Sequence, residues 1–203
     1  MSRVLVTGAG GQVGRALVVR LGERAVPRTR AELDITDAPA VRAAMEGVEA
    51  VVNAAAYTDV DGAEADREAA FAINAAGAAT VAQAARRAGA FCVHLSTDFV
   101  FDGALGRAYR EDDAPNPISV YSASKLEGER LVRAAGGHSA VVRTAWVYAA
   151  GHRNFLSTIL ERARAGATLD VVTDQVGSPT WAADLAAALA VLLDRPVPGL
   201  FHV

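Results

Sequence analysis

Residues 4–14 read VLVTGAGGQVG, and this stretch decides the fold. Residues 4–7 are apolar or β-branched and predict a short buried strand, and residues 11–21 predict a helix. Between them lie Gly8, Gly11 and Gly14, which recur every third residue. A glycine turn of this kind lets backbone N–H groups approach a phosphate at the positive end of the helix, and Gly14 allows close packing of helix on strand. The stretch therefore predicts a dinucleotide-binding unit rather than a simple turn.

Short apolar runs and longer helical runs alternate along the rest of the chain. Strands are expected at residues 25–28, 50–53, 91–96, 140–144, 169–172 and 200–203, the first weakened by Pro27. Helices are expected at 37–46, 63–88, 120–135, 154–165 and 180–193. The pattern predicts an α/β fold, a Rossmann-like, doubly wound parallel sheet with helices on both faces. Ligands bind such sheets at the carboxyl ends of strands, so function should lie in the loops that begin at Thr7, Asn53, Ser96 and Thr144.

The composition excludes several classes of protein. The chain has 203 residues, of which 52% are hydrophobic and 21% charged, as in an ordered chain of one domain or slightly more. A net charge of −3 argues against a nucleic-acid partner held by charge alone. The single cysteine, Cys92, permits no internal disulfide and favours a reducing compartment. No apolar stretch is long enough for a signal peptide or a membrane span, so we expect a cytoplasmic protein with no membrane partner.

Tyr121 and Lys125 form the second informative pattern. The 20 basic residues are 19 arginines and one lysine, and that lysine follows a tyrosine by four positions in a predicted helix. The spacing places both side chains on one helix face. A nearby ammonium favours the phenolate and should lower the tyrosine pKa from its usual value near 10 toward one suited to proton transfer. The alternative is an ordinary surface pair, which the glycine turn upstream disfavours.

Thr97 and Asp98 follow the strand expected at residues 91–96. The Thr97 hydroxyl could hydrogen-bond a substrate carbonyl and orient it toward Tyr121, and Asp98 could accept hydrogen bonds from sugar hydroxyls. Trp146 lies just past another strand end, where an aromatic ring packs against a sugar or a nicotinamide. The alternatives are a turn that closes the strand for Thr97 and Asp98, and core packing for Trp146.

These residues together resemble the dTDP-4-dehydrorhamnose reductase family of the short-chain dehydrogenase/reductase superfamily. The glycine turn and the Tyr/Lys pair are shared across the superfamily. A narrower combination points to the reductase family: GGQVG at 10–14, LDITD at 33–37, NAAAYT at 53–58, STDFVFDG at 96–103 and DQVGSPT at 174–180. The resemblance also extends over YSASKLEGE at 121–129, RTAWVY at 143–148 and Asn154-Phe155.

The resemblance implies reduction of the 4-keto group of dTDP-4-dehydro-β-L-rhamnose to dTDP-L-rhamnose, with hydride from NADPH. It implies that Tyr121 donates the proton, that Lys125 tunes Tyr121 and binds the nicotinamide ribose, and that Thr97 assists. Substrate contacts are implied for Thr97, Asp98 and Trp146. Cofactor contacts are expected at Gly8, Gly11, Gln12 and Val13 in the phosphate loop, at Asp34 and Ile35 beside the adenine, and at Ala56, Tyr57 and Thr58 beneath the cofactor.

The choice between NADPH and NADH depends on the residues after the second strand. An acidic residue there holds a ribose 2′-hydroxyl, whereas arginine suits a 2′-phosphate. Here Arg28 and Arg30 precede the first carboxylates, Glu32 and Asp34. We therefore expect Arg28 to contact the cofactor and NADPH to be preferred, with NADH possible. The alternative is that both arginines are solvated surface charges.

The expected domains are residues 1–150, an NADP(H)-binding Rossmann domain that carries the Tyr/Lys pair, and residues 151–203, a small, partial substrate lobe interleaved with the last strands. Family members usually continue well past a strand like GLFHV at 199–203. The sequence is thus expected to be part of a longer protein or to have a truncated lobe. A metal site of some members depends on residues past this point, so no metal is expected. A homodimer is left open.

Two other functions compete with the reductase. The family includes a regulatory subunit that binds cofactor without catalysis, and fold does not prove activity. Other sugar-nucleotide enzymes of the superfamily share the same core. A 4,6-dehydratase is disfavoured because Phe99 stands where it needs a Glu after Asp98, whereas an epimerase, which would retain its nicotinamide through turnover, is harder to exclude.

Overall fold

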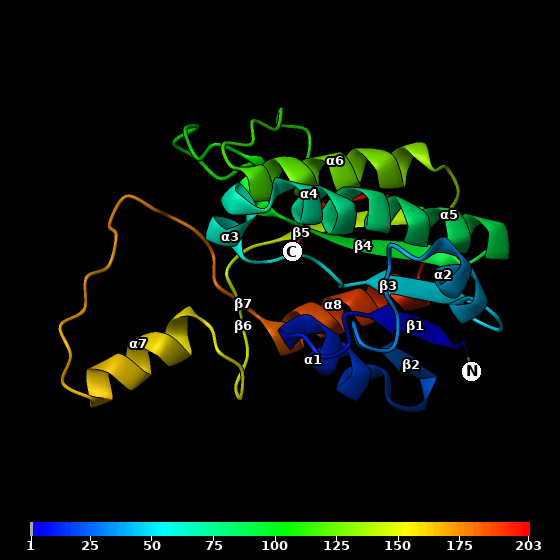
Figure 1. Ribbon diagram of the computed structural model, residues 1–203, viewed down its shortest axis with the longest axis horizontal. Coiled ribbons are helices and arrows are strands. Elements are labelled where there is room, and N and C mark those ends of the chain that lie inside the picture. The colour runs from blue at the N-terminus through cyan, green and yellow to red at the C-terminus, as the bar shows by residue number, and fades with distance from the viewer. Residues whose placement is uncertain (1) are drawn as a thin grey trace.

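The computed structural model describes residues 2–203 and has a six-stranded parallel sheet at its centre. The strand order is β2-β1-β3-β4-β5-β8 (Figure 1). The strands are β1 (Val4–Thr7), β2 (Ala25–Arg28), β3 (Ala50–Asn53), β4 (Phe91–Thr97), β5 (Ser139–Thr144) and β8 (Gly199–His202). Every residue of β1, β3 and β4 is buried, and these strands are mostly apolar on both faces. The predicted doubly wound α/β fold is confirmed.

Helices cover both faces of the sheet. Residues of α1 (Gln12–Leu21) and α8 (Ala182–Asp194) share one apolar core with one face. Residues of α2 (Ala38–Ala44), α5 (Ala78–Ala88) and α6 (Val120–Ala134) share a second core with the other face. Both helix layers therefore bury an apolar stripe, as the sequence pattern predicted. Within residues 2–203, no helix is both long and apolar enough to cross a membrane.

The long helix predicted over residues 63–88 is wrong, because the chain breaks it into several pieces. These are α3 (Val60–Ala65), α4 (Arg67–Phe71), a π-helical segment (Ala72–Gly77) and α5. Asp66 leaves the helical conformation, and its side chain accepts a hydrogen bond from the Ala69 N–H to begin α4. Alanine fits every helical position, so the alanine-rich sequence hid both the break and the π segment.

The strand predicted at residues 169–172 is also wrong, because this segment has no regular structure. A second, two-stranded sheet instead joins β6 (Val147–Tyr148) to β7 (Thr180–Trp181). Between them lie α7 (Phe155–Arg164), which the sequence predicted, and a long connection that arches away from the main sheet (Figure 1). No residue of α7 is buried. We call residues 149–179 the arm.

The last part of the chain returns to the main body. Helix α8 packs beside α1, and β8 pairs in parallel with β5. Three short 3₁₀ and π segments complete the elements: Gly22–Arg24, the π segment Ala72–Gly77, and Asp98–Val100. The C-terminal residues thus supply both an outlying arm and the edge strand of the sheet.

Candidate active site

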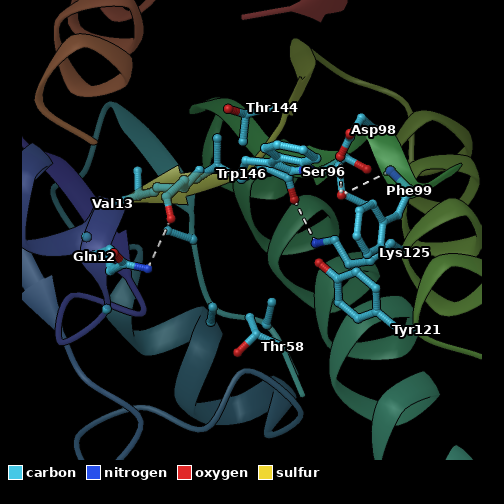
Figure 2. A pocket seen from close by; sticks show the side chains of 18 of the residues that line it. Gln12, Val13, Thr58, Ser96, Asp98, Phe99, Tyr121, Lys125, Thr144 and Trp146 are labelled. Carbon is cyan, nitrogen blue, oxygen red and sulfur yellow. Dashed lines mark hydrogen bonds between the residues drawn. The ribbon is translucent and has the colours of Figure 1, made fainter. Parts of the chain in front are cut away.

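The strand order reverses between β1 and β3, and a cavity of about 480 Å³ opens at this edge of the sheet. Its walls come from the loops that follow β1, β3, β4 and β5 and from the start of α6 (Figure 2). These are the four loops that the sequence singled out. The volume lies in the range of small-molecule and cofactor sites.

The glycine turn between β1 and α1 brings the backbone to the cavity. Gly8 has a φ of 66°, a conformation that glycine adopts at little cost. A Cβ on Gly14 would overlap the Gly8 carbonyl oxygen, and a Cβ on Gly8 would lie 2.6 Å from the Ala54 oxygen. Gly11 is the N-cap of α1 and has no side chain to cap it. The helix N-terminus is therefore open to an anionic ligand, as a phosphate-binding turn requires.

Gln12 ties this turn to the start of the arm. Its Nε2 donates to the Val147 carbonyl oxygen at 3.4 Å, the contact drawn in Figure 2. Its Oε1 accepts from Asn154 Nδ2 at 3.1 Å. Asn154 is also the N-cap of α7, with Ser157 completing a capping box. The sequence singled out Gln12 and placed Asn154 at the start of a helix, but it did not link the two, because nothing local connects positions so far apart.

Tyr121 and Lys125 lie on one face of the first turns of α6, and both side chains reach the cavity (Figure 2). A capping box of Ser119 and Ser122 begins the helix. Lys125 is buried, and its Nζ donates to the Leu95 carbonyl oxygen at 2.7 Å. Burial lowers the pKa of Lys125 to about 8, an effect that the negative charge of Glu129 opposes.

The Tyr121 pKa moves opposite to the expectation drawn from the sequence. Burial raises it to about 12; the Thr97 hydroxyl acts to lower it and the Asp98 charge to raise it further. Lys125 does not offset the burial, and its amino group is bonded to the backbone of β4. A phenol with a raised pKa stays protonated at neutral pH, which suits a proton donor.

Thr97 and Asp98 line the same cavity and also build a turn. The Thr97 hydroxyl accepts from the Phe99 N–H at 3.2 Å and donates to Asp98 Oδ1 at 3.1 Å. Burial raises the pKa of Asp98, against the hydrogen bond from Thr97. Both interpretations of Thr97 and Asp98 therefore fit the structure: the two residues close the strand with a turn, and they face a cavity where a ligand could bind.

Trp146 has a strained backbone, with a φ of 45°. The residue remains 42% exposed and its side chain lines the cavity, so it is not packed in the core. Gly177 of the arm lies directly against the indole ring: a Cβ at this position would lie 2.6 Å from the indole Cε2 atom. Strain of this kind clusters at ligand sites, where surrounding contacts maintain it.

The structure brings together most of the residues singled out from the sequence. The cavity is lined by Gly11, Gln12, Val13, Ala56, Thr58, Thr97, Asp98, Tyr121, Lys125 and Trp146. The others lie outside its lining: Gly8, Arg28, Asp34, Ile35 and Tyr57. Arg28 is nonetheless next to the glycine turn, because its carbonyl oxygen accepts from the Ala9 N–H at 3.0 Å.

Asp34 and Ile35 have structural partners of their own. The Asp34 carboxylate accepts from the Thr36 N–H and hydroxyl, and these bonds lower its pKa. The Ile35 side chain is buried in the core beneath the π segment, where a Cβ on Gly77 would lie 2.8 Å from it. The predicted contact of these two residues with a cofactor would therefore involve the Asp34 side chain and backbone atoms, and not the Ile35 side chain.

Sequence reasoning missed one residue that shapes the site. Asn74, in the π segment, bonds both the N–H and the carbonyl of Tyr57 and donates to Ser124 Oγ. It thus fixes the loop after β3 against α6. Thr144, the partner of Thr97 in the β4–β5 register, also lines the cavity. An asparagine within an alanine-rich helical run was the available signal for Asn74.

Known proteins resemble this chain in sequence and in fold. A model of the family described as the RmlD substrate binding domain matches residues 2–203. The chain belongs to this family. A dTDP-4-dehydrorhamnose reductase of Mycobacterium tuberculosis (strain CDC 1551 / Oshkosh) is 46% identical over 97% of this chain and 67% of its own length. A dTDP-4-keto-6-deoxy-D-glucose reductase of Streptomyces niveus is 41% identical over 98% of this chain and 72% of its own.

Among solved structures, a dTDP-4-dehydrorhamnose reductase of Bacillus anthracis str. Ames, in complex with NADP, superposes with a TM-score of 0.96 at 38% identity. The match covers 100% of this chain and 74% of that one. The chain thus spans about two thirds to three quarters of the length of these members of the family. Within residues 2–203, no group of three or more His, Cys, Asp or Glu side chains could hold a metal ion.

Proposed function

We propose that this chain is a sugar-nucleotide reductase that converts dTDP-4-dehydro-β-L-rhamnose to dTDP-L-rhamnose with NADPH. One observation carries the proposal: Tyr121, Lys125 and Thr97 line the same cavity as the open N-terminus of α1. A proton donor therefore lies across one cavity from a phosphate-binding turn. The substrate and the cofactor are those named for relatives and for the Bacillus anthracis structure.

The residues present fit the cofactor. A Cβ at Gly8 or Gly14 would clash with neighbouring backbone, so these glycines keep the turn tight, and the α1 N-terminus supplies N–H donors for a pyrophosphate. We assign Gly11, Gln12 and Val13 to that group and Arg28 to the 2′-phosphate. Asp34 and Ile35 are assigned to the adenine side, and Ala56, Tyr57 and Thr58 to the floor beneath the cofactor. When bound, NADPH supplies the hydride.

The reaction needs one proton for each hydride. As hydride adds to C4 of the sugar, Tyr121 gives its phenolic proton to the developing alkoxide at O4, so that the ketone becomes an alcohol. Thr97 hydrogen-bonds the keto oxygen and orients it. The Lys125 ammonium stabilises the phenolate that remains and holds a ribose hydroxyl, until Tyr121 takes a proton from solvent. Asp98 accepts from sugar hydroxyls, and Trp146 packs against the sugar.

A second sugar substrate is favoured by one finding. The Streptomyces niveus relative is named a dTDP-4-keto-6-deoxy-D-glucose reductase, at an identity close to that of the rhamnose enzymes. Both substrates present a 4-keto group on a dTDP sugar. Tyr121, Thr97 and Lys125 would perform the same proton transfer on either sugar. Selection between the two sugars would therefore depend on the residues that line the cavity around Trp146.

Location and assembly are proposals too. We infer a cytoplasmic enzyme, which the buried, unpaired thiol of Cys92 supports. A homodimer is a prediction that sedimentation of the purified chain would test. The division into a cofactor-binding domain at residues 1–150 and a partial substrate lobe at 151–203 stays a prediction.

The decisive experiment measures NADPH oxidation by the purified chain on addition of dTDP-4-dehydro-L-rhamnose, after NADPH binding is confirmed by fluorescence. We expect one NADPH consumed for each ketone reduced. Tyr121→Phe should keep NADPH binding and lower kcat by about 10²–10⁴-fold, because the proton donor is lost. NADPH binding without reduction of either dTDP sugar would contradict the reductase and favour a regulatory role. Sugar conversion with no net NADPH loss would indicate an epimerase.

A further inference from the structure

A buried ion pair lies behind the cavity and outside the residues assigned so far. Glu129 of α6 and Arg143 of β5 each have a side chain that is 4% exposed. Arg143 Nη2 donates to Glu129 Oε2 at 2.7 Å, and Arg143 Nε donates to Oε1 at 2.8 Å. The Ser96 hydroxyl of β4 donates to the same Oε1 at 2.5 Å. The Glu129 carboxylate thus joins three elements with three hydrogen bonds.

The cluster connects directly to the reacting residues. Tyr121, Lys125 and Glu129 follow one another at spacings of four on one face of α6. The last three residues of β4 contact the reacting residues and the ion pair in turn. The Leu95 carbonyl accepts from Lys125, the Ser96 hydroxyl donates to Glu129, and Thr97 follows. Any change in the Glu129–Ser96 bond therefore reaches Thr97 through one peptide unit and Lys125 through one helical turn.

The titratable groups near Lys125 lie on α6, on and just after β4, and on β5. Glu129 on the same helix favours its cationic form. His94 on β4 is buried, and burial and the Lys125 charge hold the pKa of His94 far below its usual value, so it stays neutral. Asp98 lies at the end of β4, and Arg143 on β5 is paired with Glu129. Glu129 is thus the buried carboxylate that acts on Lys125 from behind the cavity.

We propose that Glu129 is a positioning residue for the reaction, which holds β4, β5 and α6 in the register that sets Thr97 beside Tyr121 and Lys125 and keeps a negative charge next to Lys125. The part about register and turnover rests on the proposed reductase function. The part about charge concerns this chain alone and can be measured with no substrate.

The sole lysine makes the charge test specific. Protein labelled with ¹³C and ¹⁵N lysine gives one side-chain signal, which belongs to Lys125. Its chemical shift is followed between pH 6 and 11 in the wild type, in Glu129→Gln and in Glu127→Gln. Glu127 is a matched control on the same helix, with a side chain that is 38% exposed and a loose 3.5 Å contact to Arg130.

We expect Glu129→Gln to move the Lys125 titration midpoint to lower pH by about one pH unit, because the buried cation loses its neighbouring carboxylate. Glu127→Gln should leave it in place, and Glu129→Asp, which keeps the charge, should restore most of it. Should Glu129→Gln fail to fold, Glu129→Gln with Arg143→Gln removes both charges of the ion pair and leaves no buried charge unpaired. Equal midpoints in the wild type and in every folded variant that lacks the Glu129 charge would overturn the inference.

Turnover separates positioning from charge. At pH 6.5, where Lys125 stays cationic in both proteins, we expect kcat of Glu129→Gln to fall about tenfold with the KM for NADPH little changed. The deficit should grow as the pH passes the lowered midpoint. A deficit that is the same at all pH values, with an unmoved Lys125 signal, would mean a merely structural role. Wild type that is inactive on dTDP sugars would overturn the proposed function, while the titration would still decide the charge role.

Discussion

Burial makes Tyr121 and Lys125 behave unlike the same residues in water. The Tyr121 pKa rises to about 12 and the Lys125 pKa falls to about 8, so the site favours a neutral phenol and carries its cation at an energetic cost. A phenol that holds its proton is the state needed to protonate an alkoxide. The cation is the state needed to stabilise the phenolate once the proton has left. Only Lys125 lowers the stability of the folded chain at neutral pH, because Tyr121 is uncharged there in both the folded and the unfolded chain.

We predict that Lys125→Met stabilises the fold below pH 8 while it removes activity. The Lys125 pKa is lowered from 10.5 to about 8 on folding, so between these values the unfolded chain binds the extra proton and stability rises with pH. Below pH 8 the buried cation costs on the order of 3 kcal/mol, which methionine avoids. Urea unfolding between pH 6 and 10.5 measures this: the advantage of Lys125→Met should shrink steadily above pH 8.

Arg133→Met is the control, because Arg133 is an exposed cation near the end of the same helix. Its effect on stability should be small and independent of pH. A difference in the free energy of unfolding between Lys125→Met and the wild type that stays constant from pH 6 to 10.5 would contradict the prediction.

Particular residues show what sequence could and could not predict at this scale. Tyr121 and Lys125 were predictable because their spacing is local and the chain has one lysine. The direction of the Tyr121 pKa was not, because it depends on burial by elements distant in sequence. Glu129 and Arg143 were overlooked for the same reason: each is an unremarkable charged residue until α6 is laid on β4 and β5.

At the scale of elements, the βα turn from β1 to α1 is the best-determined part of the site. Its glycines have distinct physical causes: a positive φ and a close approach to Ala54 at Gly8, and contact with the turn itself at Gly14. Because both causes are local to the motif, the sequence predicted the turn. The π segment that carries Asn74 has no such local code, which is why the helix over 63–88 was predicted as unbroken.

We predict that Gly14→Ala lowers the free energy of unfolding by about 1–3 kcal/mol and weakens NADPH binding, because the new Cβ forces α1 away from the turn. Gly10→Ala is the matched variant in the same turn. Its Cβ would meet nothing closer than the Thr29 Cγ2 atom at 3.7 Å, an ordinary contact. Chemical unfolding of both variants checks this. Equal losses of stability would show that the close approach at Gly14 is not what holds the turn.

At the scale of the whole molecule, two well-packed layers contrast with the arm. The layers share two apolar cores with the sheet, whereas α7 buries no residue and the arm exposes several large apolar side chains: Phe155, Leu156, Leu160, Leu169, Val171, Val172 and Val176. Parallel pairing and alternating elements allowed the layers to be predicted. The arm departs from the alternation of strands and helices. Its apolar residues suggested a strand at 169–172, but this segment pairs with no sheet.

Local stability should follow this division, and limited proteolysis can measure it. Arg162 and Arg164 lie in the last turn of α7, whose opening breaks no core contact. Arg86 and Arg87 are also exposed, but they end α5, which packs in a core, and Arg86 Nη1 also donates to the Ala135 carbonyl oxygen at 2.8 Å. We predict that trypsin cleaves within residues 153–164 at least about tenfold faster than after Arg86 or Arg87, since each 1.4 kcal/mol of opening free energy is a factor of ten. Mass spectrometry of the early fragments decides it. Comparable rates at both places would mean that α7 is held as firmly as α5, and that its apolar face is covered in solution.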